Sequence, residues 1–519
     1  MNGSLPARPM TPPRHRGFIG LLSCLVPSHV VASRLAAACL LIALLLASAT
    51  CSQPAPEIRG ASHVVFISLD TARPDHFGFM GSETVRTPRL DAFASESIVF
   101  DDYMTVVPTT LASHTTLMTG KYPYHHGTPR NGFLVNQKNQ MLAETLREAS
   151  FHTAGFAGSF ALESRFGFSQ GFDHYDEDFG VLVTPGGADQ NQRLASQVTD
   201  AALAYLDETG VPEHLFLFAH YFDPHAPYTA PHPYDTMYDP AGWSGIPSIS
   251  AVKRHPRFSA AEREEFARRL ELQYASEISY TDEHVGRLLD GLAVRGILDD
   301  AIVVVTSDHG ECMWEHGEEF DHGRTVYQAT MHALCVVRLP GAEHAGTRVD
   351  AVVASIDVLP TVLEFLGLDA PVDIDGEALK LTRTALESQD SLVRFGEATK
   401  PGTDVETDER WYNLRKSRCV RDGRYKYIET PYVWTSELYD LASDTDEIVD
   451  LLSAEGAGRA EADPAAGPGP SRSELESLHL RLARALSTWT DLADPLPSRF
   501  DSSQRDETVE RLRSLGYLQ

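Results

Sequence analysis

Near-continuous apolar runs of strand length recur along the chain, and each leads to an acidic residue or a histidine. HVVFISLD begins at His63, HLFLFAHY at His214 and AIVVVTSDH at Ala301. Strands that are buried on both faces are apolar at almost every position, as in a parallel sheet. Between these runs, apolar residues at helical spacing predict helices over residues 142–149 and 193–208, and one or two helices over 259–295. This alternation predicts an α/β fold, with a doubly wound, mostly parallel sheet and helices on both faces.

The pattern changes near residue 385. RCVRDGRYKYIETP and SELYDL predict a small antiparallel α+β subdomain over 385–460, with Asp422-Gly423 as a hairpin turn. A linker rich in Pro and Gly follows from Ala462, and then a helix over about 473–492 and a polar tail. The predicted organisation is therefore a leader over 1–50, a main α/β domain over 61–380, this subdomain, and a linker, helix and tail over 461–519.

The first fifty residues predict export. Four arginines precede an apolar run over 35–46, and Ala47, Ser48 and Ala49 then form an A-x-A-like cleavage site. The run is too short to span a bilayer comfortably. Cys51 follows at once, and LLASATC resembles a bacterial lipoprotein signal with a lipid anchor at Cys51. Two destinations stay open, a membrane-anchored lipoprotein and a periplasmic or secreted protein.

Composition narrows the possible partners. The 519-residue chain has a formal net charge of −29, which argues against nucleic acid as a partner. An anionic substrate would need a local positive site, and a bound metal ion can supply one. Outside the leader and Cys51, the cysteines form an odd set without the spacing of a disulfide framework, namely Cys312, Cys335 and Cys419.

Three strand ends carry residues that can bind a metal ion. Asp70 ends the first run, Asp308-His309 ends the third, and His220 and His225 lie at and just beyond the end of the second. Open α/β sheets bind ligands at the carboxyl ends of their strands, so these side chains are expected to meet there. Carboxylate oxygens and imidazole nitrogens suit a divalent cation such as Ca, Mn or Zn. The sequence therefore predicts a divalent metal site at this edge.

A stretch rich in hydroxyl groups, PTTLASHTTLMTGKYPYHHG, could complete this site. Residues 111–118 can form a short helix with Thr110 at or just before its N-terminus, where backbone N–H groups and the helix dipole favour an anion. The hydroxyl of Thr110 then adds a further donor to those of the three strand ends, and a metal-bound alcohol becomes a usable nucleophile. The simpler alternative is that this threonine only caps the helix.

Nine segments in order give the chain a clear resemblance. FISLDTARPDHFGFMG, TPRLDAFASESIVF, PTT...LMTGKYPYHHG, HYFDPHAPY, YTDEHVGRLLDGL, VVVTSDHGE, DHGRTVY, IDVLPTVLEFLG and SELYDL resemble the ordered blocks of the sulfatase family, which belongs to the alkaline phosphatase superfamily. They cover about residues 63 to 445. The resemblance implies the doubly wound core with a small antiparallel C-terminal subdomain, and an enzyme that cleaves sulfate esters.

The nucleophile position departs from the sulfatase pattern. Sulfatases carry Cys or Ser there, followed by x-Pro-Ser-Arg, and oxidise this residue to formylglycine. Here Thr110 takes the place, with Ala112 for Pro, Ser113 retained and His114 for Arg. Since Thr has a methyl group on Cβ, oxidation to an aldehyde is impossible, and no formylglycine is expected. The Lys-Trp-His block of sulfatases is also replaced, by GFAGSFALESRFG.

Other members of the superfamily use threonine directly. Nucleotide pyrophosphatase/phosphodiesterases and phosphoethanolamine or lipoteichoic acid transferases form a covalent phosphoenzyme on it. Thr71 stands where a second Asp is frequent, which favours one metal ion over two. This similarity implies His322 and His225 as substrate contacts or proton donors, and a metal set of Asp70, Thr110, Asp308 and His309.

Several other residues have both a functional and a structural interpretation. Lys121 could contact an anion or be an ordinary exposed lysine, Asn131 could line the pocket or form a turn, and His220 could be a ligand or a core residue. Together with His114 they form the predicted substrate-binding set. The leading hypothesis is an exported, metal-dependent hydrolase or transferase that acts on a small anionic ester, or a lipid- or glycan-linked one, of sulfate or phosphate. The alternative is a catalytically inactive sulfatase-fold binding protein.

Overall fold

The computed structural model describes most of the chain after the leader. The described residues are 58–180, 182–184, 187–189, 191–247, 249, 258–318, 320–399, 416–454, 470–492, 496, 499–500 and 505–514. The leader with Cys51 and most of the predicted Pro- and Gly-rich linker lie outside these residues. Among the described helices, none is both long and apolar enough to cross a membrane.

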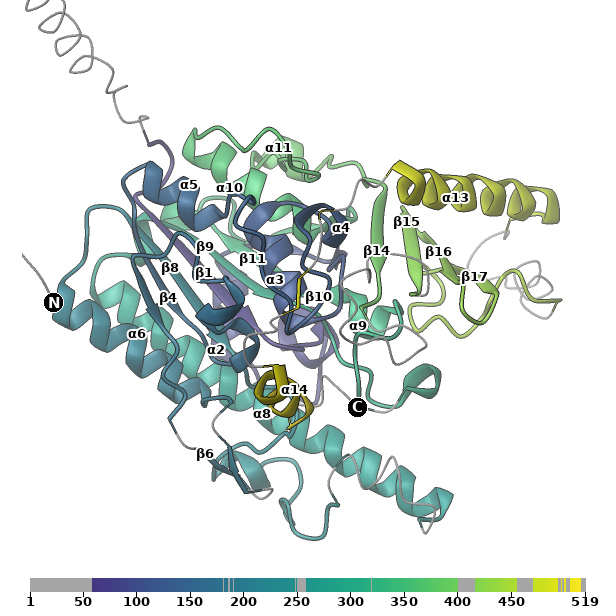
Figure 1. Cartoon of the computed structure of the whole chain (residues 1–519), viewed down its shortest axis with the longest axis horizontal. Coiled ribbons are helices and arrows are strands. Elements are labelled where there is room, and N and C mark those ends of the chain that lie inside the picture. Colours follow the sequence, from purple (N-terminus) through teal and green to yellow (C-terminus); the bar gives the residue numbers. More distant parts are fainter. Residues whose placement is uncertain are drawn as a thin grey trace, which may run out of the picture. The chain divides into compact units, whose positions relative to one another are not determined.

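An eight-stranded sheet forms the centre of the structure (Figure 1), in the order β12-β2-β11-β9-β1-β8-β4-β5. β1 runs parallel to both neighbours, while β11 is antiparallel to β9 and β2 and is the one reversed strand of this sheet. The mostly parallel sheet predicted from the apolar runs is therefore confirmed. The strands are β1 His63–Leu69, β2 Ile98–Phe100, β4 His152–Phe156, β5 His174–Asp176, β8 Leu215–Tyr221, β9 Ala301–Ser307, β11 Cys335–Arg338 and β12 Thr347–Val349.

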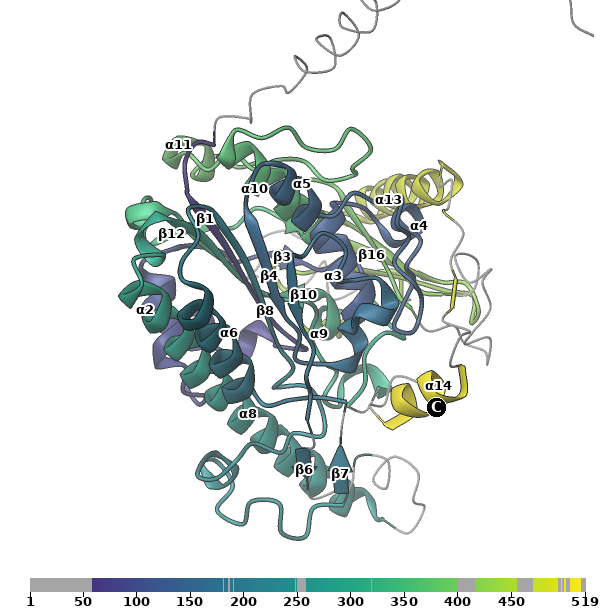
Figure 2. The same ribbon diagram turned by 60° about the vertical axis from the view of Figure 1, so that its left-hand side comes forward.

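Helices cover both faces of this sheet (Figure 2), because side chains along each strand alternate between two cores. Along β1, Val64 and Phe66 belong to one buried cluster, and Val65 and Ile67 to the other. The predicted one or two helices over 259–295 are the single helix α8. The first face carries α3 Thr110–Thr119, α5 Leu142–Glu148 and α10 Val358–Leu366, and the second carries α2 Pro88–Ser95, α6 Ala195–Thr209 and α8 Ala260–Val294.

Two small sheets and three short helices connect these layers. Within the polar passage from Gly180 to Asn191, two three-residue strands, β6 and β7, pair antiparallel and satisfy each other's backbone hydrogen bonds. A second small sheet has the order β10-β3-β13. The elements are β3 Tyr103–Met104, β6 Leu182–Thr184, β7 Gly187–Asp189, β10 His332–Ala333, β13 Val353–Ala354, α4 Pro123–His126, α9 Gln328–Met331 and α11 Arg383–Leu386.

A four-stranded antiparallel sheet follows, as predicted. Asp422 pairs with Tyr425, so the two-residue turn is Gly423-Arg424, one position later than expected. Gly423 has φ +55°, which glycine adopts without steric cost. Helix α13 packs on this sheet through Leu475, Leu482 and Leu486. The elements are β14 Arg394–Glu397, β15 Arg418–Asp422, β16 Tyr425–Thr430, β17 Thr435–Asp440, α13 Arg472–Leu492 and a last helix, α14 Arg505–Ser514.

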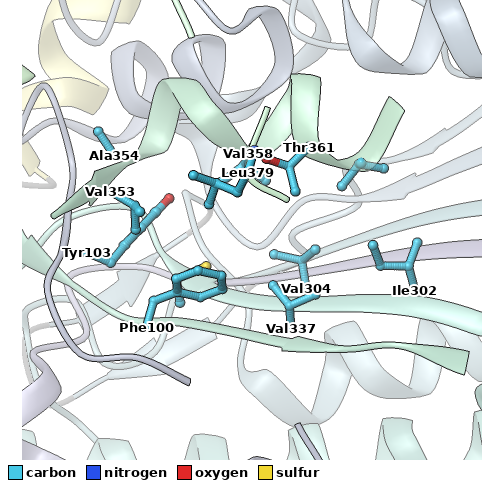
Figure 3. Close-up of a pocket in the computed structure, with 12 residues that line it drawn as sticks. Phe100, Tyr103, Ile302, Val304, Val337, Val353, Ala354, Val358, Thr361 and Leu379 are labelled. Carbon is cyan, nitrogen blue, oxygen red and sulfur yellow. Dashed lines mark hydrogen bonds between the residues drawn. The ribbon is translucent and has the colours of Figure 1, made fainter. Parts of the chain in front are cut away.

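An apolar cavity lies in the first core, between the sheet and α10 (Figure 3). Its walls offer few polar groups, among them the hydroxyls of Tyr103 and Thr361. A site for an anionic ester needs charged or hydrogen-bonding groups, so this cavity belongs to the packing of the core. The other labelled residues that line it are Phe100, Ile302, Val304, Val337, Val353, Ala354, Val358 and Leu379.

Candidate active site

The predicted strand-end residues meet at one edge of the central sheet. β1 lies between β8 and β9, and its last residue, Leu69, pairs with Tyr221 on one side and Ser307 on the other. Asp70 follows β1 directly, Asp308 follows β9, and His220 is the penultimate residue of β8. All three side chains are completely buried. The parallel register therefore brings together groups that lie far apart in the sequence.

Asp70, Asp308 and His309 form a group that can hold a metal ion, with ligand atoms within 4.8 Å of one another. The Nε2 atom of His309 lies 3.9 Å from Oδ1 of Asp70 and 3.4 Å from Oδ2 of Asp308. These three atoms are buried and make no hydrogen bond within the described part of the chain. Nδ1 of His309 donates to the carbonyl of Gly310 at 2.9 Å, which leaves a lone pair on Nε2. Three buried oxygen and nitrogen atoms that lie close together and have no hydrogen-bond partner are suitable ligands for a divalent cation.

Charge in this cluster is unfavourable without a cation. Burial raises the pKa of Asp70 to about 8, and burial together with the neighbouring Asp70 raises the pKa of Asp308 well above its usual range. Burial, with a contribution from His322, lowers the pKa of His309. A bound cation would reverse these directions for the carboxyl groups, because it favours their ionised forms.

Thr110 is the first residue of α3, and its hydroxyl faces the cluster. Oγ1 donates a hydrogen bond to Oδ2 of Asp70 at 3.3 Å. The N-cap is Thr109, which caps no backbone N–H with its side chain. The helix thus begins one residue before the predicted 111–118. Thr110 is therefore not the capping residue of the simpler alternative, and its hydroxyl is directed to an acidic side chain at the end of another element.

Two buried histidines support Thr110 and Asp70. His114, one turn into α3, uses Nδ1 toward the carbonyl of Thr110 at 2.7 Å and Nε2 toward Oγ of Ser68 at 2.8 Å. Nδ1 of His220 accepts from the N–H of Gly158 at 3.2 Å, so its ring proton is on Nε2, 3.4 Å from Oδ2 of Asp70. Burial lowers the pKa of His220 to about 3. His220 is therefore a neutral hydrogen-bond donor beside the cluster.

His322 and His225 continue the row of imidazoles that starts at His309. The ring centroids are 4.5 Å apart for His309 and His322, and 5.3 Å apart for His322 and His225. Nδ1 of His225 donates to the carbonyl of Ala226 at 2.8 Å, and its ring stacks on Phe222. The structure thus brings both predicted proton donors to the cluster.

Glu311 is a buried residue beside the cluster that the sequence analysis did not single out. Its Oε1 accepts from Nδ1 of His322 at 3.2 Å, and its Oε2 accepts from the hydroxyl of Tyr228 at 3.2 Å. The carboxylate fixes the orientation of the His322 ring. A signal was present, because Glu311 follows His309-Gly310 in the SDHGE segment, next to the candidate metal ligands Asp308 and His309.

Asn131 and Lys121 have different positions relative to Thr110. Oδ1 of Asn131 accepts from the N–H of Leu111 at 2.7 Å, so the amide lies directly beside the nucleophile position. Lys121 follows the opposite end of α3, a ten-residue helix about 15 Å long. Its Nζ forms a 2.6 Å ion pair with Asp373, and the residue is 2% exposed, not on the open surface. The structure does not bring Lys121 to the cluster.

Thr71 contributes through its backbone. Its N–H donates to Oδ1 of Asp308 at 3.0 Å, and its φ is +56°, a left-handed value that is unusual for a β-branched residue. Tyr274 on α8 donates to the carbonyl of Thr71 at 2.8 Å. This strained position holds the two strand-end carboxyl groups against each other.

Comparison with known proteins places this doubly wound α/β chain in the alkaline phosphatase superfamily. Within that class, residues 62–368 match the family model described as Sulfatase. Residues 314–461 match the model described as N-sulphoglucosamine sulphohydrolase, C-terminal. The chain belongs to the sulfatase family.

Individual relatives agree with this assignment. The ulvan-active sulfatase of Formosa agariphila is 27% identical over 337 residues, which cover 61% of this chain and 64% of that protein, just under two thirds of its length. The N-acetylglucosamine-6-O-sulfatase of Bacteroides thetaiotaomicron is 25% identical over 413 residues, which cover 64% of this chain and 73% of that protein.

Solved structures show the same fold. BT4656, in complex with its substrate D-glucosamine-2-N,6-O-disulfate, superposes with a TM-score of 0.64 at 21% identity, covering 84% of this chain and 99% of the other. The phosphonate monoester hydrolase of Agrobacterium radiobacter has a TM-score of 0.62 at 22% identity, covering 82% of this chain and 95% of the other.

Proposed function

We propose that this protein is a metal-dependent ester hydrolase that uses the unmodified hydroxyl of Thr110 as its nucleophile. One observation carries this proposal: Oγ1 of Thr110, at the N-terminus of α3, donates to Asp70 within a buried group that fits a divalent cation. Membership of the sulfatase family supports the reaction class, cleavage of a sulfate or phosphate ester.

Asp70, Asp308, His309 and Thr110 would hold the ion. When bound, a divalent cation acts as a Lewis acid that lowers the pKa of an alcohol and balances negative charge on the ester. The N-terminus of α3 adds partial positive charge at the same place. Neutral His220 and the amide of Asn131 are placed to donate to ester oxygens, while His114 supports the helix turn that carries Thr110.

Solvent and the histidines account for each proton. The hydroxyl of Thr110 gives up its proton to solvent, because a bound cation would lower the pKa of the alcohol while it keeps Asp70 ionised. As Oγ1 of Thr110 attacks, the new O–P or O–S bond forms and the bond to the leaving oxygen breaks, and His322 or His225 gives that oxygen a proton. Water then attacks the covalent intermediate and gives one proton to the histidine, and Oγ1 of Thr110 takes up a proton from solvent. Glu311 holds His322 in position throughout.

We further propose that phosphorus esters suit this site better than sulfate esters. The formylglycine route of sulfatases requires an aldehyde, which threonine cannot provide because of its Cβ methyl group. A plain alcohol nucleophile agrees with phosphoryl transfer through a phosphothreonine, and a transferase results if a second alcohol replaces water. The sulfated sugars named for the relatives make a glycan-linked ester a reasonable natural substrate class.

The test compares three ester types with purified protein. An aryl sulfate, an aryl phosphate monoester and an aryl phosphodiester are assayed after chelation and after readdition of Ca, Mn or Zn. Thr110→Ala should abolish metal-dependent cleavage, whereas Thr110→Ser should retain part of it. Hydrolysis by the wild type that is no faster than by Thr110→Ala on all three esters would favour the inactive binding protein instead.

Export is also part of the proposal, and it is supported by the basic, apolar and A-x-A-like leader. Fractionation of cells that produce the full chain should place the mature protein outside the cytoplasm. Cys51→Ala separates the two forms, because it releases the protein from the membrane only if Cys51 carries the anchor.

A further inference from the structure

The C-terminal tail returns to the catalytic domain although it lies beyond both matched family models, which end at residues 368 and 461. The N–H of Leu134 donates to the carbonyl of Arg499 at 2.7 Å, and Phe133 pairs with Phe500 in an isolated β-bridge. The two phenylalanine rings meet edge to face with centroids 5.4 Å apart. Figure 2 shows α14 on the α3 side of the sheet, and Leu512 from this helix is completely buried in the same core cluster.

The fit between the tail and this loop is close. Gly132 has φ +84°, and a Cβ atom there would lie 2.6 Å from Cδ1 of Leu512 and 2.7 Å from Cε2 of Phe500. A larger residue at this position would have to move the side chains of Leu512 and Phe500, and it would be strained at this positive φ. The absence of a side chain at Gly132 therefore leaves space into which the side chains of Leu512 and Phe500 pack.

The loop that the tail contacts, which includes Gly132, Phe133 and Leu134, also carries Asn131. Asn131 accepts from the N–H of Leu111, which is the helical residue after Thr110. A shift of the loop would therefore change the position of an amide that contacts the N-terminal turn of α3. This gives a continuous set of contacts from Leu512 to the nucleophile.

The same helix contacts a second segment of the site. The guanidinium of Arg511 lies 3.7 Å from the ring centroid of Phe160, and its Nη1 is 3.6 Å from Glu163. Phe160 follows closely on Gly158, whose N–H donates to His220 and so determines which ring nitrogen of His220 holds the proton. α14 thus supports both flanks of the cluster.

We propose that the tail, meaning residues 499–500 together with α14, is a positioning element of the active site, which holds Asn131 and the Gly158 segment against Thr110 and His220. This inference rests on the proposed function for its kinetic consequence. Phe500 and Leu512 are positioning residues rather than catalytic ones, because they act through the loop and touch no reacting atom.

The test uses substitutions in the full-length protein. Leu512→Ala and Phe500→Ala remove the apolar contacts, Leu512→Met restores similar volume, and Arg513→Ala changes an exposed residue of the same helix as a matched control. Arg511→Gln removes the charged contact of α14 and leaves the packing of Leu512 and Phe500 at Gly132 unchanged. Each is assayed for kcat and KM, thermal unfolding, and amide hydrogen exchange of peptides that cover residues 128–136.

A loosened loop should lower kcat about 10- to 100-fold, since displacement of about 1 Å can cost that much. Exchange at 128–136 should accelerate in Leu512→Ala and Phe500→Ala, remain slow in Arg513→Ala and recover in Leu512→Met. A lower unfolding temperature with unchanged kcat and unchanged exchange of this loop would overturn the inference and leave α14 only a structural role.

The exchange measurement also separates the two proposals. If the wild type shows no cleavage that depends on Thr110, the proposed function fails, yet exchange still reports whether α14 orders the loop. If the wild type is active but loop exchange is equal in Leu512→Ala and Arg513→Ala, the positioning role fails while the proposed function stands.

Discussion

Removal of the metal ion should make the stability of this protein depend on pH in an unusual direction. Carboxyl groups in most proteins have lowered pKa values, so stability is lost in acid. Here burial raises the pKa of Asp70 to about 8 in the metal-free fold. The unfolded chain has an aspartate pKa of about 3.9. The folded state therefore binds a proton that the unfolded state has released, and its stability falls as pH rises toward 8.

The expected size follows from one bound proton. Each pH unit between the two pKa values changes the free energy of unfolding by about 1.4 kcal/mol. Buried histidines such as His220, with its pKa lowered to about 3, act in the opposite direction but only below about pH 6.5. Between about pH 6.5 and 8 these histidines no longer contribute, so the metal-free protein should lose about 2 kcal/mol from Asp70, and Asp308, whose pKa burial and the neighbouring Asp70 also raise, acts in the same direction.

Urea unfolding of chelator-treated protein at about pH 6.5, 7.2 and 8.0 measures this loss. Asp70→Asn, which cannot ionise, should have a flatter profile, and added metal should stabilise the wild type most at the highest pH. An unfolding free energy of metal-free wild type that stays constant or rises over this range would refute the argument. It would show that the titration of other groups offsets the loss of stability expected from Asp70.

Three further predictions concern the reaction. His322→Ala should lower kcat for esters with poor leaving groups about 100-fold and much less for a nitrophenyl ester, and equal losses on both would remove it as the proton donor. Glu311→Gln should shift the pH dependence of kcat while thermal stability changes little, and an unaltered profile would contradict its role in holding His322. Asn131→Ala should reduce kcat/KM about tenfold, and Lys121→Ala, at the far end of α3, should reduce stability but leave kcat unchanged. Equal kinetic losses in these two variants would contradict the placement.

The cluster of Asp70, Asp308 and His309 could be predicted because its geometry follows from a simple rule. Asp70, Asp308 and His309 each follow an apolar strand, and the carboxyl ends of neighbouring parallel strands meet at one edge. Any register close to the observed one brings these residues together. The same reasoning located His220, although only the structure shows that Gly158 sets its tautomer.

Contacts that depend on side-chain direction could not be predicted. Lys121 lies in the same stretch as Thr110, yet a helix of ten residues separates them and turns the lysine to Asp373. The contact of Leu512 with the Gly132 loop joins residues that lie far apart in the sequence, and no local pattern indicates such a partner. The pairing of β6 with β7 could not be predicted either, because these short strands lack the apolar alternation by which strands are recognised in a sequence.

At Thr110 the family assignment and the chemistry of the residue point to different reactions. The family model and the fold place the chain among sulfatases, but the reaction depends on what the residue at α3's first position can become. A threonine hydroxyl bonded to Asp70 can attack an ester as it stands, and it cannot form an aldehyde hydrate. The surroundings have changed in the same sense, since His114 supports the helix turn from within where sulfatases carry an arginine. Because the hydroxyl of Thr110 can attack directly and cannot become an aldehyde, we propose phosphoryl transfer to Thr110 in place of the formylglycine chemistry of sulfatases.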